Sequence, residues 1–90
     1  MRITVIPMSH EEAEERGIPD WPTWESGVAR FGWSYDVQEE CYILAGRARV
    51  ETEDGNVEIE KGDYVVFPAG LECTWDVQEP VKKRYRMGSD

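Results

Sequence analysis

One carboxylate and two thiols occupy positions from which strands could bring them into a single site. Glu39 and Cys41 are two residues apart and share a face if their segment is a strand, while Cys73 belongs to a second strand-like segment. A carboxylate can serve as a general acid or base, a thiolate can act as a nucleophile, and the three side chains together could hold zinc. Glu39 and Cys73 are therefore the predicted catalytic residues if the protein is an enzyme.

The same alternation selects the side chains that would surround this site. Trp75 follows Cys73 at a spacing of two, and Trp33 and Tyr35 form another pair on one face of a strand. Such rings also have a simpler explanation as core packing, because small barrels fill their interiors with side chains. In the functional interpretation, the ligand-binding residues are Trp33, Tyr35, Cys41, Trp75, Lys83 and Tyr85.

The basic run at residues 82–86 must send one of its two faces inward if it forms a strand. Either Lys83 and Tyr85 point inward, or the three cations at positions 82, 84 and 86 do. Burying one lysine beside a tyrosine costs less free energy than burying three cations, so we expect the first arrangement.

An inward-facing Glu39 needs a partner, since a carboxylate in an apolar cavity costs free energy unless it is paired, protonated or bound to a cation. The alternative is that it lies exposed at the rim of the fold. The two cysteines also have a plain alternative, because buried thiols commonly act as small hydrophobic side chains. The candidate partners of Glu39 are Tyr35, Tyr42, Arg47 and Lys83.

Strand-forming segments separated by turn residues dominate the chain from residue 28 onward. The pair Asp54-Gly55 marks the clearest hairpin, and the apolar residues Ala48 and Val50 alternate with charged ones. This pattern predicts an all-β sandwich or barrel. The predicted strands are 28–35, 41–45, 47–53, 57–60, 64–67, 72–77 and 81–87.

The N-terminal part of the chain carries a different pattern. Ile3–Ile6, followed by a proline, predicts a short edge strand. Ser9 and Glu12 form a capping box and Gly17 provides a left-handed stop, which together predict one short helix. Residues 18–27 contain two prolines and two tryptophans, so we expect an extended arm laid over the domain and anchored by its tryptophans.

Two glycine-containing segments carry a recognisable spacing. Glu39 is followed after six residues by Gly46, and Gly62 is followed by Pro68 and then Gly70. These spacings resemble the two signature motifs of the cupin superfamily. The resemblance implies a double-stranded β-helix, which is the jelly-roll or cupin barrel. The implied single domain is 1–90, with strand, helix and Trp/Pro arm in 1–27 and the barrel in 28–87.

Three further stretches narrow the resemblance. The tryptophan-containing arm, the stretch 41–46 and the stretch 67–75 are similar to those of small stand-alone cupins grouped with ureidoglycine aminohydrolase and ethanolamine-utilisation cupin domains. The similarity extends from Asp20 to Tyr85. These small cupins have no common biochemical role, so the resemblance implies a fold more firmly than a reaction.

The metal site usual in cupins, three histidines and the glutamate, is not reproduced in this chain. The motif spacing places the histidine positions at Trp33 and Tyr35, or one residue earlier at each, and at Cys73, so the carboxylate of Glu39 alone remains. The one histidine of the chain, His10, lies where the helix begins and is expected to be solvated. We therefore expect neither a metal nor another cofactor.

Nineteen acidic and ten basic residues give the 90-residue chain a formal net charge of -9. Because this charge repels phosphate backbones and anionic lipid headgroups, we expect no nucleic-acid or membrane partner. The sequence contains no apolar run of about eighteen residues and no signal-peptide core, which predicts a cytoplasmic protein. In that reducing compartment, Cys41 and Cys73 are expected to be free thiols.

Three functions are compatible with these residues. The first is a cupin that binds a small polar metabolite between Glu39, Tyr35, Lys83 and the tryptophans, without a metal. The second is an enzyme of the ureidoglycine-aminohydrolase-like class that uses Glu39 and Cys73, with or without a metal. The third is an interaction scaffold whose edge strand pairs with a second copy in a homodimer.

Overall fold

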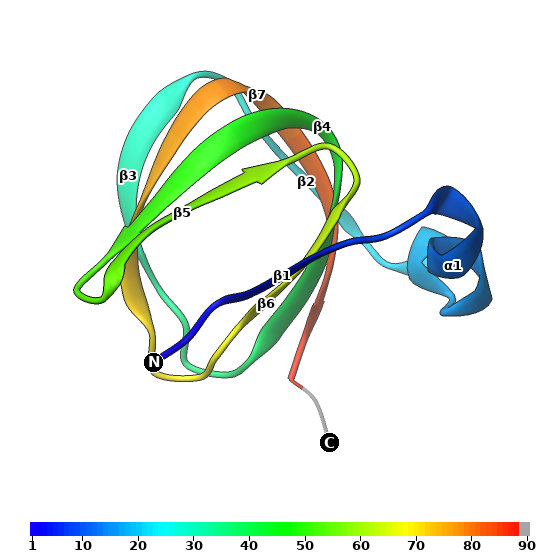
Figure 1. Ribbon diagram of the computed structural model, residues 1–90, viewed down its shortest axis with the longest axis horizontal. Helices are drawn as coiled ribbons and strands as arrows, with labels where there is room; N and C mark the ends of the chain where they lie inside the picture. Colours follow the sequence, from blue (N-terminus) through cyan, green and yellow to red (C-terminus); the bar gives the residue numbers. More distant parts are fainter. Residues whose placement is uncertain (89–90) are drawn as a thin grey trace.

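The computed structural model describes residues 1–88 and consists of one antiparallel sheet curled into a barrel, with a short helix outside it (Figure 1). The predicted all-β fold with one N-terminal helix is confirmed. The helix α1 spans His10–Glu15, and a 3-10 turn follows at Ile18–Asp20. The strands are β1 (Thr4–Pro7), β2 (Thr23–Ser26), β3 (Ala29–Ser34), β4 (Glu39–Thr52), β5 (Gly55–Glu60), β6 (Asp63–Phe67) and β7 (Glu72–Met87).

The long strands β4 and β7 hold the barrel together. They pair with each other along most of their length, and the sheet continues from β4 to β6 and β1 and from β7 to β2. β5 pairs with the second half of β4, and β3 pairs with the first half of β7. Each long strand therefore changes its outer partner part-way along. This wrapping is the jelly-roll arrangement that the cupin-like motifs implied.

The continuity of β4 and β7 differs from the prediction. The sequence predicted four short strands, whereas β4 and β7 each run on without reversing. The predicted division between strands 41–45 and 47–53, at Gly46, is wrong, because the register shifts between Ile43 and Ala48 mark β-bulges within one strand. Gly46 has a φ of +89°, and a Cβ atom there would lie 2.0 Å from the carbonyl oxygen of Pro80. The glycine thus allows β7 to approach the bulge closely.

The bulge around Gly46 also changes which residues of β4 face the interior. Before it, Cys41 and Ile43 are fully buried in the barrel core. After it, Ala48 and Val50 are fully buried in the same core. The residues of β4 that face the interior therefore switch from odd to even numbers. The predicted alternation of apolar and charged side chains in residues 47–53 is confirmed.

Residues 18–27 are more regular than the extended arm predicted for them. After the 3-10 turn, β2 pairs with β7 and places Trp24 opposite Lys83. This segment is therefore a strand of the barrel rather than a cover over it. Its tryptophans do act as anchors, since Trp24 packs against the barrel core and Trp21 is buried in a second cluster beneath the helix.

The helix α1 is fixed to the outer face of the barrel (Figure 1). The hydroxyl of Ser9 accepts a hydrogen bond from the backbone N–H of Glu12 at 3.1 Å, which confirms the predicted N-cap. The hydroxyl of Tyr42 on β4 donates to the carbonyl oxygen of Met8 at 3.0 Å. The buried residues between helix and barrel are Met8, Ala13, Ile18, Trp21, Tyr42 and Tyr64.

Glu40 organises the polar contacts of this outer face. Arg86 donates two hydrogen bonds to its Oε2, at 2.7 and 3.1 Å, and Tyr64 donates its hydroxyl to Oε1 at 2.5 Å. Burial alone would raise the pKa of Glu40, but the hydrogen bonds outweigh it and lower the pKa. The neighbouring acids Glu39 and Glu40 therefore lie on opposite faces of β4, and Glu39 faces the interior.

Replacing Gly46 by alanine tests the close approach of β7. We expect Gly46→Ala to lower the free energy of unfolding by about 3 kcal/mol or more, since it combines a strained positive φ with a backbone clash. Gly62→Ala is the matched control, because Gly62 has a similar φ of +94° and free space around its Cα. Its cost should be only about 1–2 kcal/mol in urea denaturation. Equal costs for the two variants would contradict the proposed packing role of Gly46.

Candidate functional site

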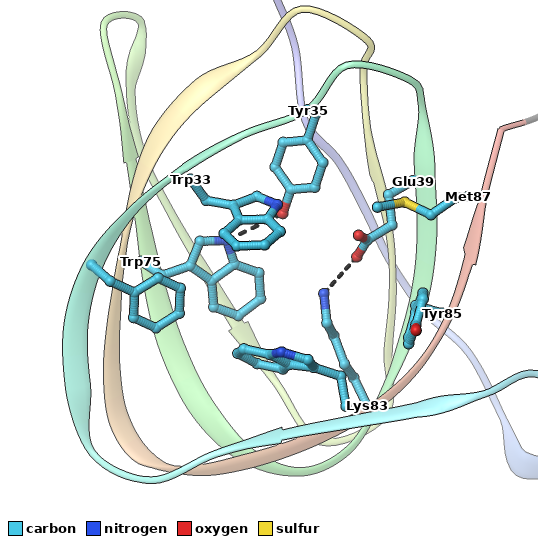
Figure 2. Close-up of a pocket in the computed structure, with 9 residues that line it drawn as sticks. Trp33, Tyr35, Glu39, Trp75, Lys83, Tyr85 and Met87 are labelled. Atoms are coloured by element: carbon cyan, nitrogen blue, oxygen red, sulfur yellow. Dashed lines mark hydrogen bonds and ion pairs between the residues drawn. The ribbon is translucent and has the colours of Figure 1, made fainter.

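A cavity of about 180 Å³ opens inside the barrel (Figure 2). It is smaller than the usual ligand pocket of about 300–1,000 Å³. Trp33 and Met87 are 45% and 47% exposed, so they lie at its mouth. The buried lining residues are Tyr35, Glu39, Trp75 and Lys83. The lining residues are Trp24, Phe31, Trp33, Tyr35, Glu39, Trp75, Lys83, Tyr85 and Met87.

An ion pair between Glu39 and Lys83 lies in this cavity. Nζ of Lys83 donates to Oε2 of Glu39 at 2.5 Å (Figure 2). The side chain of Lys83 is only 7% exposed and that of Glu39 only 4%. The residues are not opposite each other in the sheet, because Glu39 pairs with Met87 and Lys83 with Ile43. The lysine side chain therefore extends along the interior to reach the acid. Lys83 is thus the partner of Glu39 among the predicted candidates.

Aromatic rings surround the ammonium group of Lys83. Its Nζ lies 4.9 Å from the ring centroid of Trp75, 5.1 Å from that of Trp24 and 5.9 Å from that of Phe67. The negative faces of such rings attract a cation, most strongly where water is excluded. The buried charge is therefore stabilised by three rings as well as by one carboxylate.

Tyr35 adds a neutral polar group to the cavity wall. Its hydroxyl oxygen accepts a hydrogen bond from Nε1 of Trp75 at 3.2 Å (Figure 2). Its ring stacks on Phe67 at a centroid distance of 4.7 Å. Burial, and then the nearby charge of Glu39, raise the pKa of Tyr35 well above its usual range. The phenol stays protonated, so the net charge of the cavity lining is set by Lys83 and Glu39.

The two cysteines do not line this cavity. Cys41 is fully buried in the barrel core, and burial raises the pKa of its thiol to about 12. Cys73 lines a separate shallow hollow with Glu72, and its Sγ lies 3.6 Å from the carbonyl oxygen of Trp33. Burial raises the pKa of Cys73 to about 11, although the charge of Lys83 partly opposes it. Both side chains are free, neutral thiols at pH 7.

The structure brings together most of the residues singled out in the sequence. Trp33, Tyr35, Glu39, Trp75, Lys83 and Tyr85 line the cavity, whereas Cys41 and Cys73 lie apart from it. The inward orientation expected for Lys83 and Tyr85 is confirmed. Phe31, which alternation places on the same face as Trp33 and Tyr35, lines the cavity as well. Sequence reasoning missed Trp24 and Met87 as lining residues.

The side chains of this site do not fit the metal centre usual in cupins. Trp33, Tyr35 and Cys73 stand where the motif spacing places histidines, and the remaining donor, Glu39, is held by an ammonium group. A cation bound to Glu39 would meet the positive charge of Lys83 at close range. Within residues 1–88, no group of three or more histidine, cysteine, aspartate or glutamate side chains is arranged to hold a metal ion. His10 pairs with Glu14 on the surface of α1.

Comparison with known proteins identifies the family. Residues 13–85 match the family of the EutQ-like cupin domain. The chain belongs to this cupin family. No curated protein matches the chain.

No helix among the described residues is long and apolar enough to cross a membrane.

Solved structures share the cupin barrel. A DUF861 family protein from Thermotoga maritima is 46% identical, with a TM-score of 0.91, and the alignment covers 96% of this chain and 99% of that one. A DUF1255 protein of unknown function from Acidithiobacillus ferrooxidans is 25% identical, with a TM-score of 0.66 over 69% of this chain and 60% of that one. The EutQ protein of Clostridium difficile is 18% identical, with a TM-score of 0.68 over 73% of this chain and 52% of that one, and shows the fold alone.

A double-mutant cycle tests the ion pair of the cupin cavity. Glu39→Gln or Lys83→Met alone leaves one buried charge without its partner, so each should lower the free energy of unfolding by about 3–5 kcal/mol. The double variant should lose clearly less than the sum, because neither charge remains. Urea denaturation of the four proteins gives the coupling free energy. Additive losses would show that the two groups do not interact.

Thiol labelling tests the burial of the cysteines. At pH 8 we expect Cys73 to react roughly a hundredfold more slowly than a free cysteine, since its raised pKa leaves little thiolate. Its rate should rise about tenfold per pH unit towards pH 11, while Cys41 should react only on unfolding. The variants Cys41→Ser and Cys73→Ser separate the two signals in a disulfide-exchange assay. Rapid labelling of Cys73 at pH 7 would instead indicate an activated nucleophile.

Proposed function

We propose that this cupin binds a small molecule of zero net charge in the barrel cavity, without a metal. The observation that carries the proposal is the buried ion pair of Glu39 and Lys83, which lines the cavity and is neutral as a unit. A ligand with a net charge would bring an uncompensated charge into a poorly solvated space, which costs several kcal/mol. A neutral ligand avoids that cost.

The ion pair also specifies the polar edge of such a ligand. Lys83 can donate a hydrogen bond to a carbonyl-type oxygen, and Glu39 can accept one from a neighbouring N–H or O–H. The hydroxyl of Tyr35 adds a third polar group in the same cavity. A ligand with an acceptor beside a donor, as in an amide, matches these groups.

The rest of the cavity favours a flat or compact body. The rings of Phe31 and Trp75 are stacked with an interplanar angle of 6°. Trp24 makes an edge contact with Trp75 and a tilted contact with Phe31. Such rings supply apolar contact area for a ligand's faces. The cavity volume of about 180 Å³ limits the ligand to a small metabolite.

An enzyme of the ureidoglycine-aminohydrolase-like class, based on Glu39 and Cys73, has less support. The thiol of Cys73 lines a different hollow from the carboxylate, and its raised pKa opposes the thiolate form that a nucleophile requires. The carboxylate and the thiol thus line different hollows, although Trp33 lines both.

Three small probes of similar size test the charge preference. Propanamide, propanoate and propylammonium are titrated into the protein, and binding is followed by tryptophan fluorescence and by NMR chemical shifts. Propanamide should bind at least about tenfold more tightly than either charged probe, because it alone leaves the ion pair intact and balanced. Tighter binding of a charged probe would contradict the proposal.

Variants locate the binding in the cavity. The double variant Glu39→Leu with Lys83→Met removes the polar edge but keeps the cavity neutral, and it should lose propanamide binding. Lys82→Met is the matched control, because Lys82 is the exposed neighbour of Lys83 on β7. Its affinity for propanamide should equal that of the unaltered protein. Unchanged binding by the double variant would place the site elsewhere.

A further inference from the structure

Lys83 differs from the other lysines of the chain in its surroundings. Lys61 and Lys82 are exposed, whereas Lys83 is 6% exposed and lines the cavity. Its amine is therefore the lysine nitrogen that a molecule inside the barrel would meet. The carboxylate of Glu39 lies at hydrogen-bond distance from that nitrogen.

We infer that Lys83 condenses with a small, uncharged aldehyde or ketone in the cavity and holds it as an iminium ion paired with Glu39. The inference rests on the proposed function, because it needs the carbonyl compound to enter as a neutral ligand. It adds a covalent step that binding alone does not require. Nothing is oxidised or reduced in this step.

Glu39 can carry the protons that the condensation moves. Its Oε2 takes one proton from the ammonium of Lys83, across the 2.5 Å hydrogen bond, and leaves a neutral amine. The nitrogen lone pair forms a bond to the carbonyl carbon as the C=O π bond breaks and its electrons move to oxygen. That oxygen then takes a proton from the nitrogen to give a neutral carbinolamine. Glu39 then returns its proton to the carbinolamine oxygen, the C–O bond breaks, and one water leaves as the C=N bond forms.

The charge balance of the site is the same before and after the reaction. An ammonium and a carbonyl compound become an iminium and water, so the nitrogen carries one positive charge before the reaction and one after it. The rings of Trp24, Phe67 and Trp75 and the carboxylate of Glu39 that stabilise the ammonium can therefore stabilise the iminium as well. An exposed lysine has no such fixed surroundings.

Reductive trapping tests the inference. The whole protein is incubated at pH 7 with propanal and sodium cyanoborohydride, and modified lysines are located by peptide mapping with mass spectrometry. Lys83 should gain the propyl group at least about tenfold faster than Lys61 and Lys82, which serve as internal controls. An excess of propanamide, which has the same shape but does not condense, should slow the modification of Lys83 and leave that of Lys82 unchanged.

Two variants separate covalent chemistry from binding. Lys83→Arg keeps a cation beside Glu39 but has no primary amine, so the residue-83 adduct should disappear. Glu39→Gln should reduce trapping at Lys83 by about tenfold, because the proton carrier is lost. If the unaltered protein binds propanamide but modifies Lys83 no faster than Lys82, the iminium inference is wrong and the binding proposal stands. If it neither binds propanamide nor favours Lys83, both fail.

Discussion

A buried pair of opposite charges determines the chemistry of this barrel. Removing a carboxylate and an ammonium from water costs several kcal/mol for each ion, and their attraction offsets that cost only with close geometry and further support. Here the support comes from the aromatic rings around Lys83, so these rings do more than fill the interior. The ammonium group of Lys83 and the carboxylate of Glu39 must lie within hydrogen-bond distance of each other. This requirement constrains the register of the strands that contribute to the cavity.

The long strands β4 and β7 satisfy this constraint because their side chains point alternately into and out of the barrel. On β4, Glu39 points inward to Lys83 while Glu40 points outward to Arg86, so two adjacent acids are each matched by a cation from β7. The bulge at Gly46 then lets the second half of β4 contribute apolar residues to the same core. The polar site and the packed core are thus separate regions of one strand, and the glycine marks the change between them.

Period-two alternation explains what could be predicted from the sequence and what could not. It correctly oriented Lys83 and Tyr85, and extended by one more step it would have selected Met87. It could not choose Lys83 over the other candidate partners of Glu39, because a contact between residues 39 and 83 depends on register and on side-chain reach. The role of Gly46 was misjudged because a glycine with positive φ serves a turn and a bulge equally well. The position of Trp24 was also mispredicted, because the two prolines that precede it indicated an irregular arm rather than the short strand β2.

The lysine gives this cupin cavity a different character from a site that holds a metal. Lys83 is part of β7, so unlike a bound metal ion it cannot dissociate, and it stays beside the same carboxylate. An ammonium offers hydrogen bonds and, after losing a proton, a nucleophilic lone pair. Glu39 correspondingly serves as a counter-ion and proton acceptor. The carboxylate position of the cupin motif can thus be retained while its partner changes from an external ion to a side chain, which moves the expected chemistry towards neutral ligands and amine condensation.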